Sequence, residues 1–177
     1  MVDGAGASQH SPGMGETTEP FATGGCDCGE IRYRLHADPM VVHCCHCRWC
    51  QRESGSAFAV NAVFEADLVE LTGGTPESVM RPSESGRGQE VSYCPQCKVV
   101  LWSHYGGAGA KASFVRVGTL DDPGRCPPGV HIFTESKQPW VVLPEGAEVF
   151  EKFYRGPDVP RLYGEAGAAR WKAVRGG

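Results

Sequence analysis

The sequence lacks any long apolar run. No stretch of its 177 residues approaches the roughly 20 apolar residues that a membrane-spanning helix needs. The first residues, Met1 to Gly15, also lack the apolar core of a secretory signal peptide. We therefore expect a cytoplasmic protein without a membrane partner.

A surplus of basic charge is also missing. Lys and Arg number 17 against 21 Asp and Glu, and the basic residues are scattered rather than gathered into a stripe. This pattern offers no electrostatic footprint for nucleic acid, so we expect no nucleic-acid partner. No fixed repeat and no strand–helix alternation occur, which excludes a doubly wound α/β sheet.

Short segments with two-residue alternation or β-branched and aromatic enrichment predict a mainly β fold of short antiparallel strands. Clusters of Gly, Pro and Asp separate these segments as turns. The segments expected to form strands are Ile31–Leu35, Met40–His43, Phe58–Phe64, Leu68–Leu71, Val91–Tyr93, Val99–His104, Phe114–Val117, His131–Phe133 and Trp140–Leu143. Short helices are expected only over Arg48–Ser54 and Glu148–Tyr154.

The length favours a single globular domain. Residues 1–20 contain little that could pack and predict a flexible leader. Residues 21–155 hold the patterned segments and all nine cysteines, and residues 156–177, rich in Gly, Ala and Arg, predict a loose tail.

Nine cysteines are many for a chain of this size. Disulfides rarely persist in a reducing compartment, so close-set thiols there indicate metal ligands or redox centres. An odd number also leaves one thiol unpaired in any disulfide scheme. A redox dithiol of the thioredoxin type would need a strand–helix context and a single dithiol, and neither is present.

The spacing of the cysteines divides seven of them into two sets. Residues at positions i and i+2, such as Cys45 and Cys47, point to the same face of an extended chain, whereas Cys44 and His46 point to the other face. Cysteines at positions i and i+3, with two residues between them, can reach one Zn²⁺ ion through a turn. The resulting sets are Cys45, Cys47 and Cys50, and Cys26, Cys28, Cys94 and Cys97.

Four thiolates would close a structural zinc site, and three would leave a position open for chemistry. The sequence therefore predicts two Zn²⁺ ions per chain. A fourth ligand could instead close the second site, and the candidates for it are Cys44, His43, His46 and His104.

Several motifs in sequence order resemble the glutathione-dependent formaldehyde-activating enzyme family, which also includes centromere protein V. The matching stretches are Gly25-Cys26-Asp27-Cys28-Gly29, Cys45-His46-Cys47-Arg48-Trp49-Cys50, Ser54-Gly55-Ser56, Cys94-Pro95-Gln96-Cys97, Val117-Gly118-Thr119-Leu120-Asp121-Asp122 and Lys137-Gln138-Pro139-Trp140. The resemblance spans roughly Gly24 to Tyr154. It implies a β-tent zinc fold, a structural zinc on the four-cysteine set and a catalytic-type zinc on the three-cysteine set.

The resemblance also implies a zinc-dependent carbon–sulfur lyase that activates a small thiol, such as glutathione, for reversible addition to formaldehyde or a related aldehyde. The residues expected to bind substrate are Arg48, Trp49, Gln51, Arg52, Ser54, Ser56, Asn61, Lys137 and Trp140. Two other classes stay open: a noncatalytic zinc-stabilised binding module, and a thiol-redox or metal-sensing protein.

Three residues depart from the family pattern. Lys98 stands where relatives usually carry Gly, so a positive φ there would store on the order of 1 kcal/mol of strain. Cys44 and Cys126 are additional thiols, and either could be an inert small hydrophobe.

Overall fold

The structure is a computed structural model that describes residues 19–176. Residues 1–18 of the expected leader lie outside the described residues. The described chain has eleven strands and two α-helices, which confirms the mainly β class. None of its helices combines the length and apolar character needed to cross a membrane.

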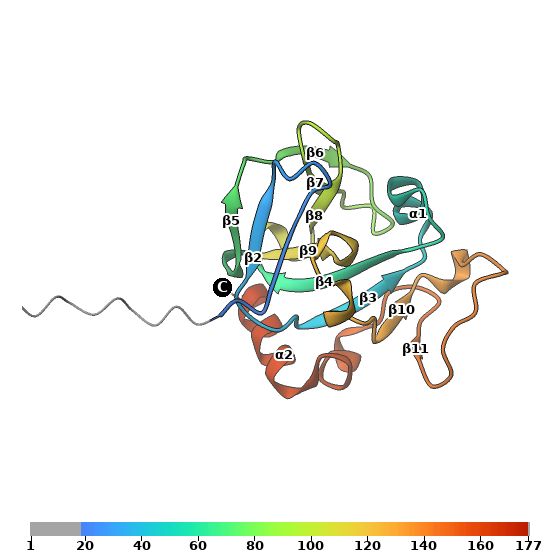
Figure 1. Cartoon of the computed structure of the whole chain (residues 1–177). Helices are drawn as coiled ribbons and strands as arrows, with labels where there is room; N and C mark the ends of the chain where they lie inside the picture. Colours follow the sequence, from blue (N-terminus) through green and yellow to red (C-terminus); the bar gives the residue numbers. More distant parts are fainter. Residues whose placement is uncertain (1–18, 177) are drawn as a thin grey trace, which may run out of the picture.

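Two sheets form the fold (Figure 1). The larger sheet has the order β11 (Glu148–Val149), β10 (Val130–Ile132), β3 (Val41–Cys45), β4 (Ala59–Glu65), β9 (Ala112–Arg116), β8 (Val100–Tyr105), β7 (Gln89–Tyr93) and β6 (Glu77–Arg81). The smaller sheet has the order β1 (Ala22–Gly25), β2 (Arg32–Leu35) and β5 (Val69–Gly73). The pairing departs from the all-antiparallel expectation at β10, which runs parallel to both β3 and β11.

Short 3₁₀ helices connect several of these strands. They span Ala66–Leu68, Gly109–Lys111, Val117–Thr119, Pro123–Arg125, Thr134–Ser136 and Gly156–Asp158. The helices α1 (Arg48–Ser54) and α2 (Val159–Gly176) complete the described fold.

A hydrophobic core joins side chains of the small sheet to one face of the large sheet. In β2 the pattern alternates, so Tyr33 and Leu35 are buried while Arg34 is exposed. Tyr33 packs edge-on against Trp102 of β8, with ring centroids 5.8 Å apart. This contact holds β2 next to β8 and brings the start of the domain near the β7–β8 turn.

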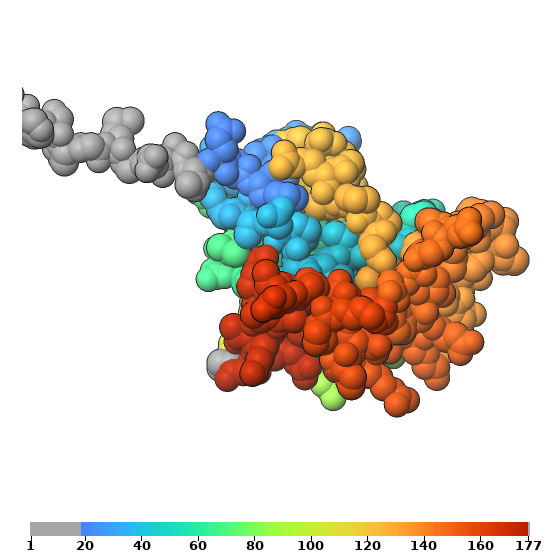
Figure 2. Space-filling view, turned by 90° about the horizontal axis from the view of Figure 1, so that it is seen from below, coloured from blue at the N-terminus to red at the C-terminus, as the bar shows by residue number. Residues whose placement is uncertain are grey.

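A second core includes residues of α1 and α2, and the C-terminal segments cover this side of the molecule (Figure 2). The backbone of α2 approaches β3 closely, because a Cβ added at Gly167 would lie 2.8 Å from the carbonyl oxygen of Met40. Arg170 of α2 also donates two hydrogen bonds to the carboxylate of Glu65 in β4. The helix is therefore fixed to the large sheet by both packing and charge.

Three expectations about secondary structure are wrong. The segment Glu148–Tyr154 forms β11 followed by irregular chain instead of a helix, because Phe150 and Glu148 pair with β10. The segment Trp140–Leu143 is not a strand, and Trp140 is 71% exposed. Residues 156–176 are ordered instead of loose: a 3₁₀ turn is followed by α2, which is kinked at Gly164 and buries Tyr163, Gly167 and Val174.

Candidate metal centres and active site

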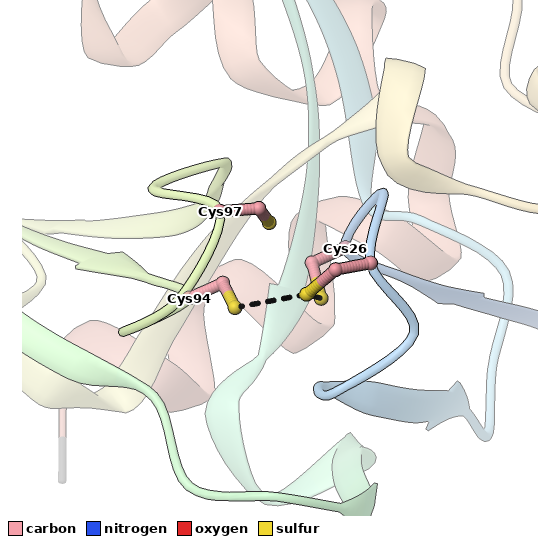
Figure 3. Close-up of side chains that lie close together, drawn as sticks. Cys26, Cys94 and Cys97 are labelled. Atoms are coloured by element: carbon pink, nitrogen blue, oxygen red, sulfur yellow. Dashed lines mark hydrogen bonds between the residues drawn. The ribbon is translucent and has the colours of Figure 1, made fainter.

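The four sulfur atoms of Cys26, Cys28, Cys94 and Cys97 lie within 4.8 Å of one another. They come from the loop after β1 and from the β7–β8 turn, and Figure 3 shows Cys94 and Cys97 pointing toward Cys26. The sulfur of Cys28 lies 3.5 Å from that of Cys26 and 3.7 Å from that of Cys94. Sulfur atoms on a tetrahedral Zn²⁺ with bonds of about 2.3 Å would be about 3.8 Å apart, so this set fits the ion.

Backbone hydrogen bonds shape the turn that carries Cys94 and Cys97. The amide of Lys98 donates to the carbonyl of Cys94 at 3.0 Å, and the amide of Cys94 donates to the carbonyl of Val99 at 2.9 Å. Lys98 has φ of 62°, the left-handed conformation expected at this position. The strain inferred from the sequence therefore has a structural basis.

The sulfur atoms of Cys45, Cys47 and Cys50 form a second buried group, also within 4.8 Å of one another. Cys45 ends β3, Cys47 is the N-cap of α1 and Cys50 lies in the first turn of that helix. The amide of Cys50 donates to the sulfur of Cys47 at 3.4 Å. A strand end and a helix start thus place three thiols around one point.

This three-sulfur group contains no other Cys, His, Asp or Glu from the described residues. His43 and His104 belong to no such group, and Cys44 and His46 fall in a different one. No fourth candidate ligand of the described chain therefore lies within this distance of all three sulfur atoms.

The proximity of the three thiols alters their acidity. Hydrogen bonds from Cys45 and then Cys50 lower the pKa of Cys47, and the bond to Cys47 helps raise the pKa of Cys45 well above its usual value. The hydrogen bond with Cys45 lowers the pKa of Cys50, but Cys47 and burial outweigh it and raise that pKa to about 12. The protein alone thus favours a single thiolate, and full ionisation of the group needs a cation.

A buried cation, Arg116, lies beside this group. Its guanidinium donates hydrogen bonds to Asn61, Glu53 and Ser103. Burial alone would lower its pKa, but electrostatic interactions with Tyr105, Glu53 and Cys50 raise it, so the side chain stays positively charged. Nothing in the motifs indicated this residue, because its hydrogen-bond partners come from three separate elements, α1, β4 and β8.

A cavity of about 440 Å³ opens beside the three-sulfur group, and all three of its cysteines line it. Its wall is mostly apolar, and the charged side chains of Arg87, Arg175 and Glu84 also line it. The aromatic lining residues are Trp49, Tyr105, Phe114, Phe133, Phe153 and Trp171. Its volume and lining are those of a small-molecule site.

His43 forms part of the same cavity wall. Its Nε2 lies 2.8 Å from the hydroxyl of Tyr154, which in turn lies 2.6 Å from the hydroxyl of Tyr163. Burial lowers the pKa of His43 to about 3, so the imidazole is neutral at ordinary pH. These bonds link the cavity wall to α2.

The expected substrate-binding residues divide into two groups. Trp49 and Asn61 line the cavity, and the Oδ1 of Asn61 accepts a hydrogen bond from Arg116. The cavity lining does not include the other seven, which are Arg48, Gln51, Arg52, Ser54, Ser56, Lys137 and Trp140.

Several of these seven have structural partners instead. Gln51 donates to the carbonyls of His46 and Ser136, and it accepts hydrogen bonds from Arg48 and Gln138. The ammonium of Lys137 donates to the carbonyls of Gln138 and Val141. The guanidinium of Arg52 lies 5.8 Å from the ring centroid of Trp49. The hydroxyl of Ser54 donates to the carbonyl of Cys50 and accepts from the amide of Ser56.

Comparison with known proteins decides the family. Residues 21–136, more than half of the chain, match the sequence model of the glutathione-dependent formaldehyde-activating enzyme family. The chain belongs to this family. The family-matched segment contains both cysteine groups and Arg116, whereas Phe153, Trp171 and Arg175 of the cavity wall lie beyond it.

No functionally curated protein matches the chain. Among solved structures, a crystal structure of a Rhodobacter sphaeroides protein is similar, with 16% sequence identity and a TM-score of 0.44. The similarity covers 72% of this chain and 98% of that chain.

Proposed function

We propose that this family member is a zinc-dependent enzyme of the carbon–sulfur lyase type. It would activate a small thiol such as glutathione for reversible addition to formaldehyde or a related aldehyde. The observation that carries the proposal is the three-cysteine group, which offers three candidate ligands and faces a cavity. A closed set of four ligands, like the other cysteine group, would support structure only.

In this proposal Cys45, Cys47 and Cys50 hold one Zn²⁺, and Cys26, Cys28, Cys94 and Cys97 hold the other. When bound, the ion at the three-cysteine site would supply a Lewis acid that favours the thiolate form of a substrate thiol. The sulfur of the thiol adds to the aldehyde carbon, the C=O π bond opens, and the thiol proton ends on the new hydroxyl. The reverse reaction breaks the carbon–sulfur bond.

The residues of the cavity would orient the reactants. Trp49 provides an apolar wall, and Arg116 offsets negative charge next to Cys50. Arg87 and Arg175 are exposed cations at the cavity and would attract the carboxylates of a glutathione-like thiol. His43 is neutral and would be able to form a hydrogen bond with a hydroxyl formed in the cavity.

We also propose a cytoplasmic location. All nine cysteines lie in the described residues and are free thiols, seven of them in the two cysteine groups. Free thiols in such groups are typical of reducing compartments.

The first test measures zinc by elemental analysis in protein purified without added metal. The parent should contain zinc at both cysteine groups, Cys50→Ser should lose about one equivalent and stay folded, and Cys97→Ser should lose the fold. Cys126→Ser is the matched control, because Cys126 is a buried thiol outside both groups. Zinc content that is equal in the parent and both ligand variants would contradict the assignment.

The second test follows exchange between glutathione, formaldehyde and their hemithioacetal by NMR. The parent should accelerate exchange over the uncatalysed rate, and Cys50→Ser should not. Zinc retained at both groups without acceleration would instead support a noncatalytic zinc-stabilised module.

A further inference from the structure

A third group of metal-ligating side chains lies outside the two cysteine groups. Candidate ligand atoms of Cys44, His46 and His131 all lie within 4.8 Å of one another, and all three residues are buried. Cys44 belongs to β3, His46 follows that strand, and His131 belongs to β10. The parallel pairing of β10 with β3 places His131 opposite Cys44, so residues far apart in sequence meet.

This group occupies the opposite side of β3 from the three-cysteine group. Side chains alternate along an extended chain, so Cys44 and His46 point away from Cys45 and Cys47. The amide of His46 donates to the carbonyl of Ile132 at 3.0 Å, which continues the strand pairing past Cys45. The two groups therefore use different side chains of one segment.

The two imidazoles face each other. The Nε2 of His46 lies 3.1 Å from the Nδ1 of His131, and the rings are stacked with an interplanar angle of 23°. Two nitrogen ligands at 2.0–2.1 Å from a tetrahedral ion would be about 3.3 Å apart. The distance between the two facing nitrogens is thus close to the one that a shared ion requires.

Neither ring is committed to another partner. The outer nitrogens, Nδ1 of His46 and Nε2 of His131, are buried and have no hydrogen-bond partner among the described residues. With both rings neutral, their mutual bond leaves one N–H and one lone pair unpaired. Such buried unpaired groups are uncommon and call for an explanation. No third group fixes the tautomers, so both facing nitrogens can present lone pairs to an ion.

We propose that Cys44, His46 and His131 form a third metal site, for a soft or borderline ion with one thiolate and two imidazole ligands. Cu⁺ and Zn²⁺ both accept this ligand set. Binding replaces the proton of the Cys44 thiol with the metal and releases that proton to solvent.

Charge favours Cu⁺ over Zn²⁺ at this site. With one thiolate, Cu⁺ gives a neutral centre, whereas Zn²⁺ leaves a net charge of +1. Lys137 already contributes positive charge near His46, and burying a further net charge is costly. Entry of an ion requires only local opening at the edge of the sheet, where β10 has three residues and β11 has two.

The test adds one equivalent of Cu⁺ anaerobically to zinc-loaded protein and then measures copper and zinc per chain. The parent should retain one copper and keep all its zinc. Cys44→Ser and His131→Gln should retain no copper, or should lose one zinc for each copper bound. Cys126→Ser, which changes another buried thiol, should behave like the parent.

X-ray absorption at the copper edge of the parent gives a second readout that needs no variant. One sulfur and two nitrogen neighbours would support the site, and neighbours that are all sulfur would overturn it. Copper bound by the parent only in exchange for zinc would overturn it as well.

A parallel titration with Zn²⁺ distinguishes the ions. Additional zinc that binds the parent but not Cys44→Ser would support the site and overturn the preference for Cu⁺. Equal uptake of both ions by the parent and Cys44→Ser would overturn the third site itself.

Discussion

The hydroxyl of Tyr154 lies 2.8 Å from Nε2 of His43 and so joins the segment before α2 to strand β3. Tyr154 is also bonded to Tyr163, which makes it the middle member of a buried chain of three polar groups. The position of His43 in the cavity therefore depends on residues more than a hundred positions away.

Replacing Tyr154 should test this dependence. Tyr154→Phe removes the central hydroxyl and leaves two buried polar groups unpaired, so the free energy of unfolding should fall by about 1–3 kcal/mol. Tyr163→Phe removes only the outer hydroxyl and should cost less. Urea unfolding measures both, and a smaller loss for Tyr154→Phe than for Tyr163→Phe would contradict the chain as described.

The cation Arg116 should strengthen metal binding at the three-cysteine group. Arg116→Met alone leaves Glu53 buried without its partner and should destabilise the fold by about 3–5 kcal/mol. The double variant Arg116→Met/Glu53→Gln avoids that unpaired charge. It should bind zinc at the three-cysteine group about tenfold more weakly, because positive charge near Cys50 is lost.

Competition with a chelator measures the zinc affinity of the double variant. The four-cysteine group serves as the internal reference and should keep its affinity. Equal weakening at both groups would show a general loss of stability instead of a local electrostatic effect.

Arg175 should contribute to recognition of an anionic thiol. Arg175→Glu reverses a charge at the cavity, so KM for glutathione should rise about five- to tenfold while kcat changes little. Lys172→Glu makes the same charge change on α2 at a residue outside the cavity lining, and its KM should stay near that of the parent. The same KM for both variants would show that Arg175 does not contribute to binding of the thiol.

Replacing Lys98 with glycine should relieve the backbone strain at this position. Lys98→Gly should raise the free energy of unfolding by about 1 kcal/mol relative to Lys98→Ala, because Ala keeps a Cβ at φ of 62°. Comparison with Ala cancels the loss of the lysine side chain near Tyr93 and Glu77. Thermal unfolding of the zinc-loaded proteins measures the difference, and a less stable Gly variant would rule out the strain.

Local patterns in the sequence predicted the parts of the structure that depend on near neighbours. The alternation of side chains along Cys44 to Cys47 separated these residues into the sets that the structure brings together, and helix α1 has its predicted bounds. The roles of these sets as zinc sites stay predictions.

Elements without such patterns were missed. Strand β6 is exposed along its whole length and shows no apolar alternation, and β1 contains two glycines. Helix α2 is rich in Gly and Ala, which suggested a loose chain. In the structure, its Gly167 is what permits close contact with β3.

The site was predicted only in part, because long-range pairing completes it. His131 meets Cys44 through the pairing of β10 with β3, and Trp171 reaches the cavity through the docking of α2. Neither contact leaves a signal in the spacing of residues along the chain. Lys137 lies in a family motif and Gln51 directly follows one, and both were expected to contact substrate, but their polar groups bond to the protein itself.

The separation between the family-matched segment and the remaining cavity wall has an evolutionary consequence. The cysteine groups lie within residues 21–136, while Trp171 and Arg175 are encoded later in the gene. Changes confined to residues 137–176 can therefore reshape the wall without altering any cysteine of the two groups. Relatives with the same cysteines and a different C-terminal segment would be expected to diverge in the molecules they accept while preserving the underlying chemistry.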